Sequence, residues 1–155
     1  MNKIGFMQGR LTRPPQGLIQ YFPVSGWKNE FNLASRLDFK VMEWTLDNHP
    51  FESNPILCTS HKEVIRDLCA KYKINLPSIT CDCFMQNPLW VKQNASQNKN
   101  RLDLVLEACK VHSISILVVP LVDNSRITCA EQVIDMKKLF SDFSSFMRKT
   151  GIQFA

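Results

Sequence analysis

Short apolar, β-branched runs alternate along the chain with longer segments in which apolar residues recur every three or four positions. The short runs predict five strands, at Ile4–Met7, Val41–Trp44, Leu76–Cys81, Ser115–Val119 and Ile152–Ala155. Successive runs start 35 to 39 residues apart, which is close to the length of one strand, one helix and their connections. The pattern therefore predicts parallel strands joined by right-handed helical crossovers, in the order βαβαβαβαβ.

The segments between these runs predict four helices, each with one apolar face. In chain order the faces are Phe31, Ala34 and Leu37; Val64, Ile65, Leu68 and Cys69; Leu102, Val105, Leu106 and Cys109; and Val133, Met136, Phe140, Phe143 and Met147. Ser60 and Thr128 each precede a Glu by three residues, which is typical of a capping box at a helix start. Asn100 is a candidate cap for the third helix, and Gly151 is expected to end the fourth.

A doubly wound sheet and a (β/α) barrel share this order of elements, and periodicity cannot separate them. The connections that leave the strands are long and rich in polar and aromatic residues, whereas those that enter the strands are short. This asymmetry is typical of a barrel whose active site lies at the C-terminal ends of its strands. We therefore predict an α/β fold, a partial (β/α)8 TIM barrel of about four βα units plus a fifth strand, with residues 1–155 as a single domain.

Composition adds few constraints. The chain is 45% hydrophobic and 21% charged, as in ordinary globular proteins, and it has no apolar run long enough to span a bilayer and no signal peptide. We therefore expect a cytoplasmic protein without a membrane partner. The net charge of +5 is scattered along the sequence, so we expect no nucleic-acid partner. Six cysteines lack zinc-finger spacing, and a reduced, mostly structural role is expected for them.

Several short motifs occur in an order and spacing that is specific only as a set. They are Met7-Gln8-Gly9-Arg10-Leu11, Ile19-Gln20, Phe22-Pro23, Trp27, Glu30-Phe31, Glu43-Trp44, Cys81-Asp82, Phe84-Met85, Pro88-Leu89 and Val119 to Ser125. With them the chain resembles the N-terminal half of sugar-phosphate isomerase/epimerase proteins of the xylose-isomerase-like TIM-barrel superfamily. The resemblance implies an isomerase or epimerase whose partner is a small-molecule sugar or sugar phosphate. Cys83 departs from it, because an aromatic residue is expected there.

The resemblance also implies a divalent metal, Mn, Mg or Zn, in the full-length family. Its four ligands would follow strands five to eight, and this sequence stops at the fifth strand, Ile152–Ala155. We therefore expect no metal and no turnover from these 155 residues alone, and name no catalytic residue. His61 and His112 lie at helix ends and are not placed as ligands. His49 lies in the loop after the second strand and could reach the mouth of the barrel, but a surface position is expected for it.

Five polar residues at or after strand ends are the candidates for substrate binding: Gln8, Arg10, Glu43, Asp82 and Asp123. Arg10 can bind a phosphate in a bidentate manner, or can form a salt bridge within the first loop. Glu43 can accept a hydrogen bond from a sugar hydroxyl, with Trp44 as a stacking wall, or can pair with a neighbouring Arg. Asp123 has an alternative role in an Asx turn.

Two other functions stay open. A truncated half-barrel could act without catalysis, by associating with a partner or forming a homodimer through its open sheet edges. A DNA-repair endonuclease of the same superfamily, similar to AP endonucleases, is permitted by the basic charge. That class uses a cluster of histidines and carboxylates around zinc, which three poorly placed histidines do not provide.

Overall fold

The computed structural model describes residues 4–15 and 21–155. Five strands, β1 (Gly5–Met7), β2 (Val41–Thr45), β3 (Asn75–Thr80), β4 (Ile116–Val118) and β5 (Gln153–Phe154), form one parallel sheet. All five strands lie where the sequence predicted them. Ile19 and Gln20, which belong to the sequence motifs, lie outside the described residues. The long crossover helices are α1 (Trp27–Arg36), α2 (Lys62–Tyr72), α4 (Ala95–His112) and α5 (Ala130–Thr150).

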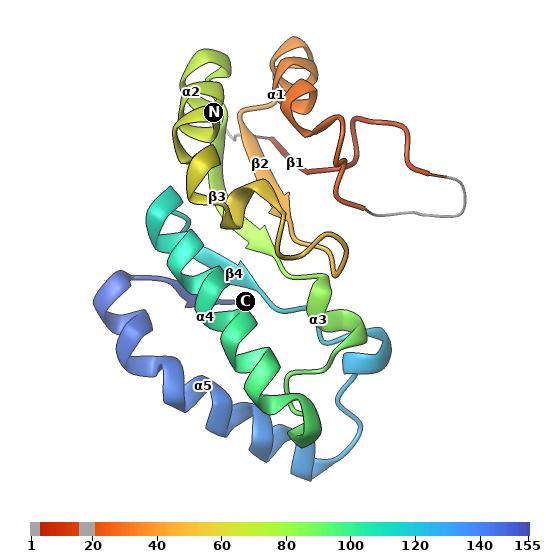
Figure 1. Cartoon of the computed structure of the whole chain (residues 1–155), viewed down its shortest axis with the longest axis vertical. Coiled ribbons are helices and arrows are strands. Elements are labelled where there is room, and N and C mark those ends of the chain that lie inside the picture. Colours follow the sequence, from red (N-terminus) through yellow and green to blue (C-terminus); the bar gives the residue numbers. More distant parts are fainter. Residues whose placement is uncertain (1–3, 16–20) are drawn as a thin grey trace.

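The order of the strands in space decides between the two architectures. Spatial order follows chain order, β1-β2-β3-β4-β5, without the reversal that defines a doubly wound sheet. Right-handed crossovers in a sheet of sequential order place every helix on the same face. The long helices accordingly follow one another around the outside of the sheet (Figure 1). The structure is a partial (β/α) barrel that stays open, as predicted.

Strand register divides the sheet into a helix-covered face and an open face. Trp44, Ile79 and Leu117 are register neighbours, are fully buried and point toward the helices. Trp44 contacts Trp27 of α1 edge-on, with ring centroids 5.7 Å apart. Side chains alternate along a strand, so the preceding register row points the opposite way. That row contains Met7, Glu43, Ser78, Ile116 and Gln153, and it belongs to the open face.

The helix starts differ from the sequence prediction in three places. Ser60 belongs to a 3-10 turn, Thr59–His61, and its hydroxyl lies 3.4 Å from His61 Nδ1, so it caps no helix. Asn100 lies inside α4, which begins five residues earlier at Ala95. The capping box of α5 lies one residue later than predicted, because Gln132 closes it on Cys129. Capping motifs allow such shifts because Asn, Ser and Thr also suit turns and helix surfaces.

The predicted apolar faces are largely confirmed. The face of α4 is completely buried. The main exception is Leu37, which is 60% exposed because α1 ends at Arg36 and Leu37 follows as its C-cap. Val133, near the start of α5, is also exposed. The short elements in the loops after the strands were not predicted, among them the four-residue helix α3 (Cys83–Gln86) after β3 and the 3-10 turns Pro55–Leu57 and Lys92–Asn94.

Each return from a helix to the next strand passes through a residue with left-handed backbone. These residues are Asp38, Lys73, Ser113 and Gly151, with φ of 61°, 56°, 57° and 76°. Gly151 ends α5 as predicted, and its N–H donates to Met147 O. The returns are short, so the N-terminal ends of the strands carry little more than turns.

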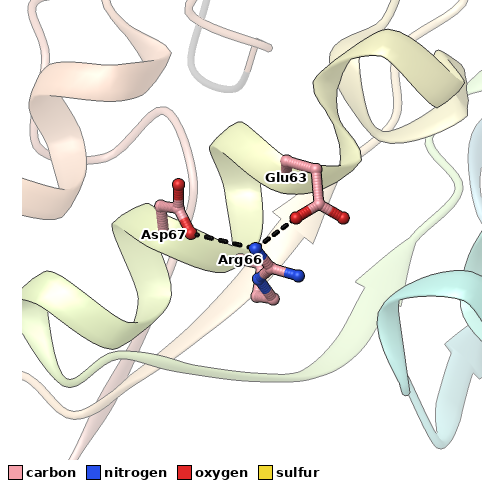
Figure 2. A network of polar contacts seen from close by, with 3 residues as sticks. All are labelled: Glu63, Arg66 and Asp67. Carbon is pink, nitrogen blue, oxygen red and sulfur yellow. Dashed lines mark hydrogen bonds and ion pairs between the residues drawn. The ribbon is translucent and has the colours of Figure 1, made fainter.

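The outer surface of α2 is polar. Arg66 lies between Glu63 and Asp67 and forms ion pairs with both, and all three side chains are mostly exposed (Figure 2). Pairs of this kind contribute little to stability. None of the described helices is long and apolar enough to cross a membrane.

Candidate active-site edge

The five candidate residues all lie in or after strands near the C-terminal end of the sheet, but in different environments. Gln8 is completely buried where β1 ends. Its backbone N–H donates to Glu43 O, and its side-chain Oε1 accepts from Thr45 N at 3.3 Å. The Thr45 hydroxyl in turn donates to Gln8 O at 2.9 Å. Through these hydrogen bonds Gln8 extends the contact between β1 and β2 by one residue beyond the last residue of β1.

The loop after β1 is held by a buried carboxylate from α1. Glu30 is 0% exposed, and its Oε2 accepts from Gly9 N at 2.7 Å. Its Oε1 accepts from Leu11 N and from the Thr12 hydroxyl, both at 3.1 Å. Gly9 has a φ of 91°, and a Cβ atom there would lie 2.1 Å from Tyr21 O. The loop that carries the exposed Arg10 is therefore fixed at its base by one acid and one glycine.

The open face carries a polar cluster near the ends of β2 and β3. Glu43 is half-buried, and its Oε2 accepts a hydrogen bond from the Ser78 hydroxyl at 2.7 Å. One row further along, Thr45 and Thr80 are register neighbours on the same face. Both side chains are buried, but only the Thr45 hydroxyl is hydrogen-bonded. The Thr80 hydroxyl makes no hydrogen bond with any described atom. The side-chain Nε2 of Gln8 is likewise buried and unpaired.

Polar anchors also fix the loop after β2. Asn54 Oδ1 accepts from Trp44 Nε1 at 3.0 Å and from Ile56 N at 3.2 Å. Burial raises the pKa of Asp47, and the hydrogen bond from Phe22 N opposes this effect. These contacts hold the second loop against the end of β2 and against the first loop.

An arginine from α4 reaches the same loop. Arg101 Nη1 donates to Asn48 Oδ1 at 2.8 Å, and its guanidinium lies 4.6 Å from the centroid of the Phe51 ring. A longer ion pair, of 3.5 Å, joins it to Glu52. Nothing in the sequence near Arg101 indicates this role, because its partners are about 50 residues away in the chain.

The last two candidates lie at the other side of this edge. Asp82 is half-buried and directly precedes α3. Asp123 is exposed in a 3-10 turn, Asp123–Ser125, with a left-handed φ of 51°. Gln86 of α3 bridges to this turn, donating to Asp123 Oδ2 at 3.4 Å and accepting from Asn124 Nδ2 at 2.7 Å. The structure therefore joins Gln8 with Glu43, and connects the Asp123 turn to α3, which follows Asp82.

The residues that the structure describes do not form a metal site. Within residues 4–15 and 21–155, no three His, Cys, Asp or Glu side chains come together as metal ligands do. Cys81, Cys83 and Cys109 are buried thiols, and burial raises the pKa of Cys109 to about 12. The described residues therefore hold no ready cluster of ligands for a divalent cation.

No family model and no curated protein sequence matches the chain. Solved structures do match. A D-psicose 3-epimerase in the presence of D-fructose superposes with a TM-score of 0.63 and 15% identity, over 82% of this chain and 45% of that one. A D-psicose 3-epimerase with D-tagatose, from Clostridium cellulolyticum H10, gives 0.64 and 12%, over 83% and 45%. A xylose isomerase-like TIM barrel protein from Mycobacterium smegmatis in complex with magnesium gives 0.63 and 15%, over 98% and 53%.

The chain has the fold of about half of a TIM barrel, as these structures have it. It spans about half the length of the solved structures it matches. Identities of 15% or less show a common fold and carry no information about substrate. The predicted fold and the predicted structural resemblance are thus confirmed, while the roles of the five candidate residues stay predictions.

Proposed function

We propose that this chain is the substrate-binding half of a barrel that isomerises or epimerises a sugar or sugar phosphate. The observation that carries the proposal is the Glu43–Ser78 pair, a carboxylate and a hydroxyl on the open face of a sheet with this fold. Similar structures with this fold include two epimerases that were solved with the ketoses D-fructose and D-tagatose. A carboxylate and a hydroxyl on this face can both form hydrogen bonds with the hydroxyl groups of a polyhydroxylated ligand.

The geometry of Glu43 supports a role in hydroxyl recognition. The carboxylate is half-buried and accepts from one donor among the described residues, Ser78, whereas an ionised carboxylate can accept about four hydrogen bonds. Hydrogen bonds from hydroxyls to a carboxylate are short and strong, and they discriminate well against ligands that lack the hydroxyl. Arg10, exposed in the first loop, is the proposed contact for a phosphate, and Asp82 and Asp123 are proposed contacts at the rim.

Catalysis needs groups that the described residues do not gather. Moving a proton beside a sugar carbonyl requires an acid or base and a group that stabilises the developing charge. We propose that a divalent metal such as Mn, Mg or Zn supplies this stabilisation in the complete barrel, held by residues outside those described. One similar structure was solved with magnesium. The proposed location is the cytoplasm.

The second candidate is a half-barrel that acts by association. The described sheet ends at β1 and β5, and each of these strands pairs with one described neighbour. All strands are parallel, so a two-fold axis along them brings β5 of one copy beside β1 of the other without reversing direction. A second copy of the chain is the proposed partner, since two copies match the length of one similar barrel.

Ligand titration monitored by amide chemical shifts tests the first proposal. We expect D-fructose or D-tagatose to shift amides of β2 and β3 near Glu43 and Ser78, and Glu43→Gln to weaken the effect. Glu107→Gln is the matched control, because Glu107 pairs with Lys110 on the exposed surface of α4. Shifts confined to the N-terminal ends of the strands, or equal affinity in both variants, would overturn the proposal.

The phosphate part has its own test. If Arg10 binds phosphate, fructose 6-phosphate should bind more tightly than D-fructose, and Arg10→Gln should abolish the difference while leaving D-fructose binding intact. An advantage of the phosphorylated sugar that survives Arg10→Gln would place the phosphate elsewhere.

A further inference from the structure

Two threonines lie side by side at the ends of the central strands, and only one of them has a satisfied hydroxyl. Thr45 of β2 and Thr80 of β3 are register partners, 0% and 3% exposed. The Thr45 hydroxyl donates to Gln8 O at 2.9 Å. The Thr80 hydroxyl makes no hydrogen bond with any atom of the described chain. Two threonines in matched positions therefore differ in whether their hydroxyl group has a hydrogen-bond partner.

An unpaired buried hydroxyl destabilises the folded chain. Burying a polar group without a partner costs more than burying an apolar group of the same shape. Valine has the shape of threonine and a higher preference for strands, so the backbone of β3 gives no reason for a hydroxyl here. The hydroxyl of Thr80 thus needs an explanation beyond the fold.

The surroundings of Thr80 indicate what the hydroxyl serves. Thr80 points to the open face, one register row beyond Ser78 and its hydrogen bond to Glu43. Val118, its register partner on β4, and Glu43 are both half-buried, so solvent reaches the open face next to Thr80, whose own hydroxyl is buried. On the far side of Thr45, Gln8 Nε2 is a second buried polar atom without a partner. Two unpaired polar groups and one carboxylate thus line the same end of the sheet.

We propose that Thr80 is a specificity-determining residue whose hydroxyl binds a hydroxyl of the polyhydroxylated ligand. The proposal rests on the proposed function and adds a contact to it. Glu43 and Ser78 recognise one part of the ligand, and Thr80, one row nearer the strand ends, recognises a neighbouring hydroxyl. The Gln8 amide is a further donor at the same end, and its carbonyl oxygen is already committed to Thr45 N.

The test compares Thr80→Val with Thr45→Val in two measurements. Thermal unfolding without ligand should show an unchanged or higher Tm for Thr80→Val, because it removes an unpaired buried hydroxyl. Thr45→Val should lower the Tm, because it removes a hydrogen bond that is made. A drop in Tm for Thr80→Val comparable to that of Thr45→Val would overturn the inference, since the hydroxyl would then have a structural partner.

Ligand titration with D-fructose is the second measurement. Thr80→Val should weaken binding about tenfold or more, as expected when a site loses a hydroxyl contact. A set of monodeoxy fructoses then locates the contact: one analogue should lose affinity for the wild type and show no further loss with Thr80→Val. Wild-type affinity in Thr80→Val would overturn the inference while leaving the proposed function intact. A wild type that binds no D-fructose would overturn the proposed function, and the Tm comparison would still report whether the hydroxyl is unpaired.

Discussion

Replacing Glu30 by Gln tests whether a buried acid organises the first loop. Glu30 Oε2 accepts from Gly9 N, and Oε1 accepts from Leu11 N and the Thr12 hydroxyl. Glutamine keeps the shape but offers one acceptor oxygen. With that oxygen placed toward Leu11, the new NH2 group faces the Gly9 N–H, and two donors confront each other in a buried position.

The magnitude follows from these three contacts. A hydrogen bond to a charged group contributes about 1.5 to 3 kcal/mol, and an unpaired buried donor costs about 1 to 3 kcal/mol. Removing the charge offsets part of this loss, because a buried carboxylate is costly to desolvate. We therefore expect Glu30→Gln to lower the free energy of unfolding by about 2 to 4 kcal/mol.

Urea unfolding followed by tryptophan fluorescence measures this difference. Glu63→Gln is the matched control, because Glu63 is exposed and its ion pair with Arg66 should contribute less than about 1 kcal/mol (Figure 2). The first loop should also become more sensitive to limited proteolysis in Glu30→Gln and not in Glu63→Gln. Equal losses of stability in the two variants would refute the reasoning.

The remaining predictions concern a glycine, a thiol and the sheet edges. Gly9→Ala should cost several times more stability than Gly151→Ala, because both have positive φ but only at Gly9 would a Cβ clash, 2.1 Å from a backbone oxygen; similar midpoints in urea would contradict this. Burial raises the pKa of Cys109 from 9.0 to about 12, so the unfolded chain loses its thiol proton first and stability falls as pH rises between those values. Cys109→Ala should remove up to about 1.4 kcal/mol per pH unit from that decline, and an unchanged slope in urea titrations across this range would exclude the effect. Sedimentation at micromolar concentration should show a dimer that dissociates on dilution, because the edges of β1 and β5 can template pairing. A cooperative monomer at every concentration would contradict the association proposal.

The sequence predicted the elements well because their signals are local. Five strands and four long helices appear where periodicity placed them, since burial of one helix face or one strand is written in residues close together. The predictions failed where local signals are ambiguous. Ser60 and Asn100 suit a cap, a turn or a helix surface equally well, and tertiary packing chose among these.

For the candidate site, the sequence predicted at which end of the sheet the residues lie but not which partners they contact. Parallel strands put Glu43, Asp82 and Asp123 toward the same end of the sheet, and topology alone implies this. The partners of these residues depend on contacts between distant segments, such as Ser78 with Glu43 across 35 residues. Glu30 had a usable signal, because it lies on the buried stripe of α1 with Trp27 and Phe31. A charged residue on an apolar stripe indicates a buried acceptor, although nothing in the sequence identifies its donors.

The turns that lead from the helices into the next strands contain residues with positive φ, and their backbone strain could be removed by mutation to raise stability. Among Asp38, Lys73, Ser113 and Gly151, only the glycine adopts positive φ without steric cost, and a side chain there costs about 1 kcal/mol. Replacing Lys73 or Ser113 by glycine would relieve that strain. Both residues lie before the N-terminal ends of strands, whereas the polar cluster on the open face lies near their C-terminal ends. The strained helix returns and the proposed ligand contacts therefore lie at opposite ends of the same strands, so a glycine at Lys73 or Ser113 should raise the Tm without changing ligand binding.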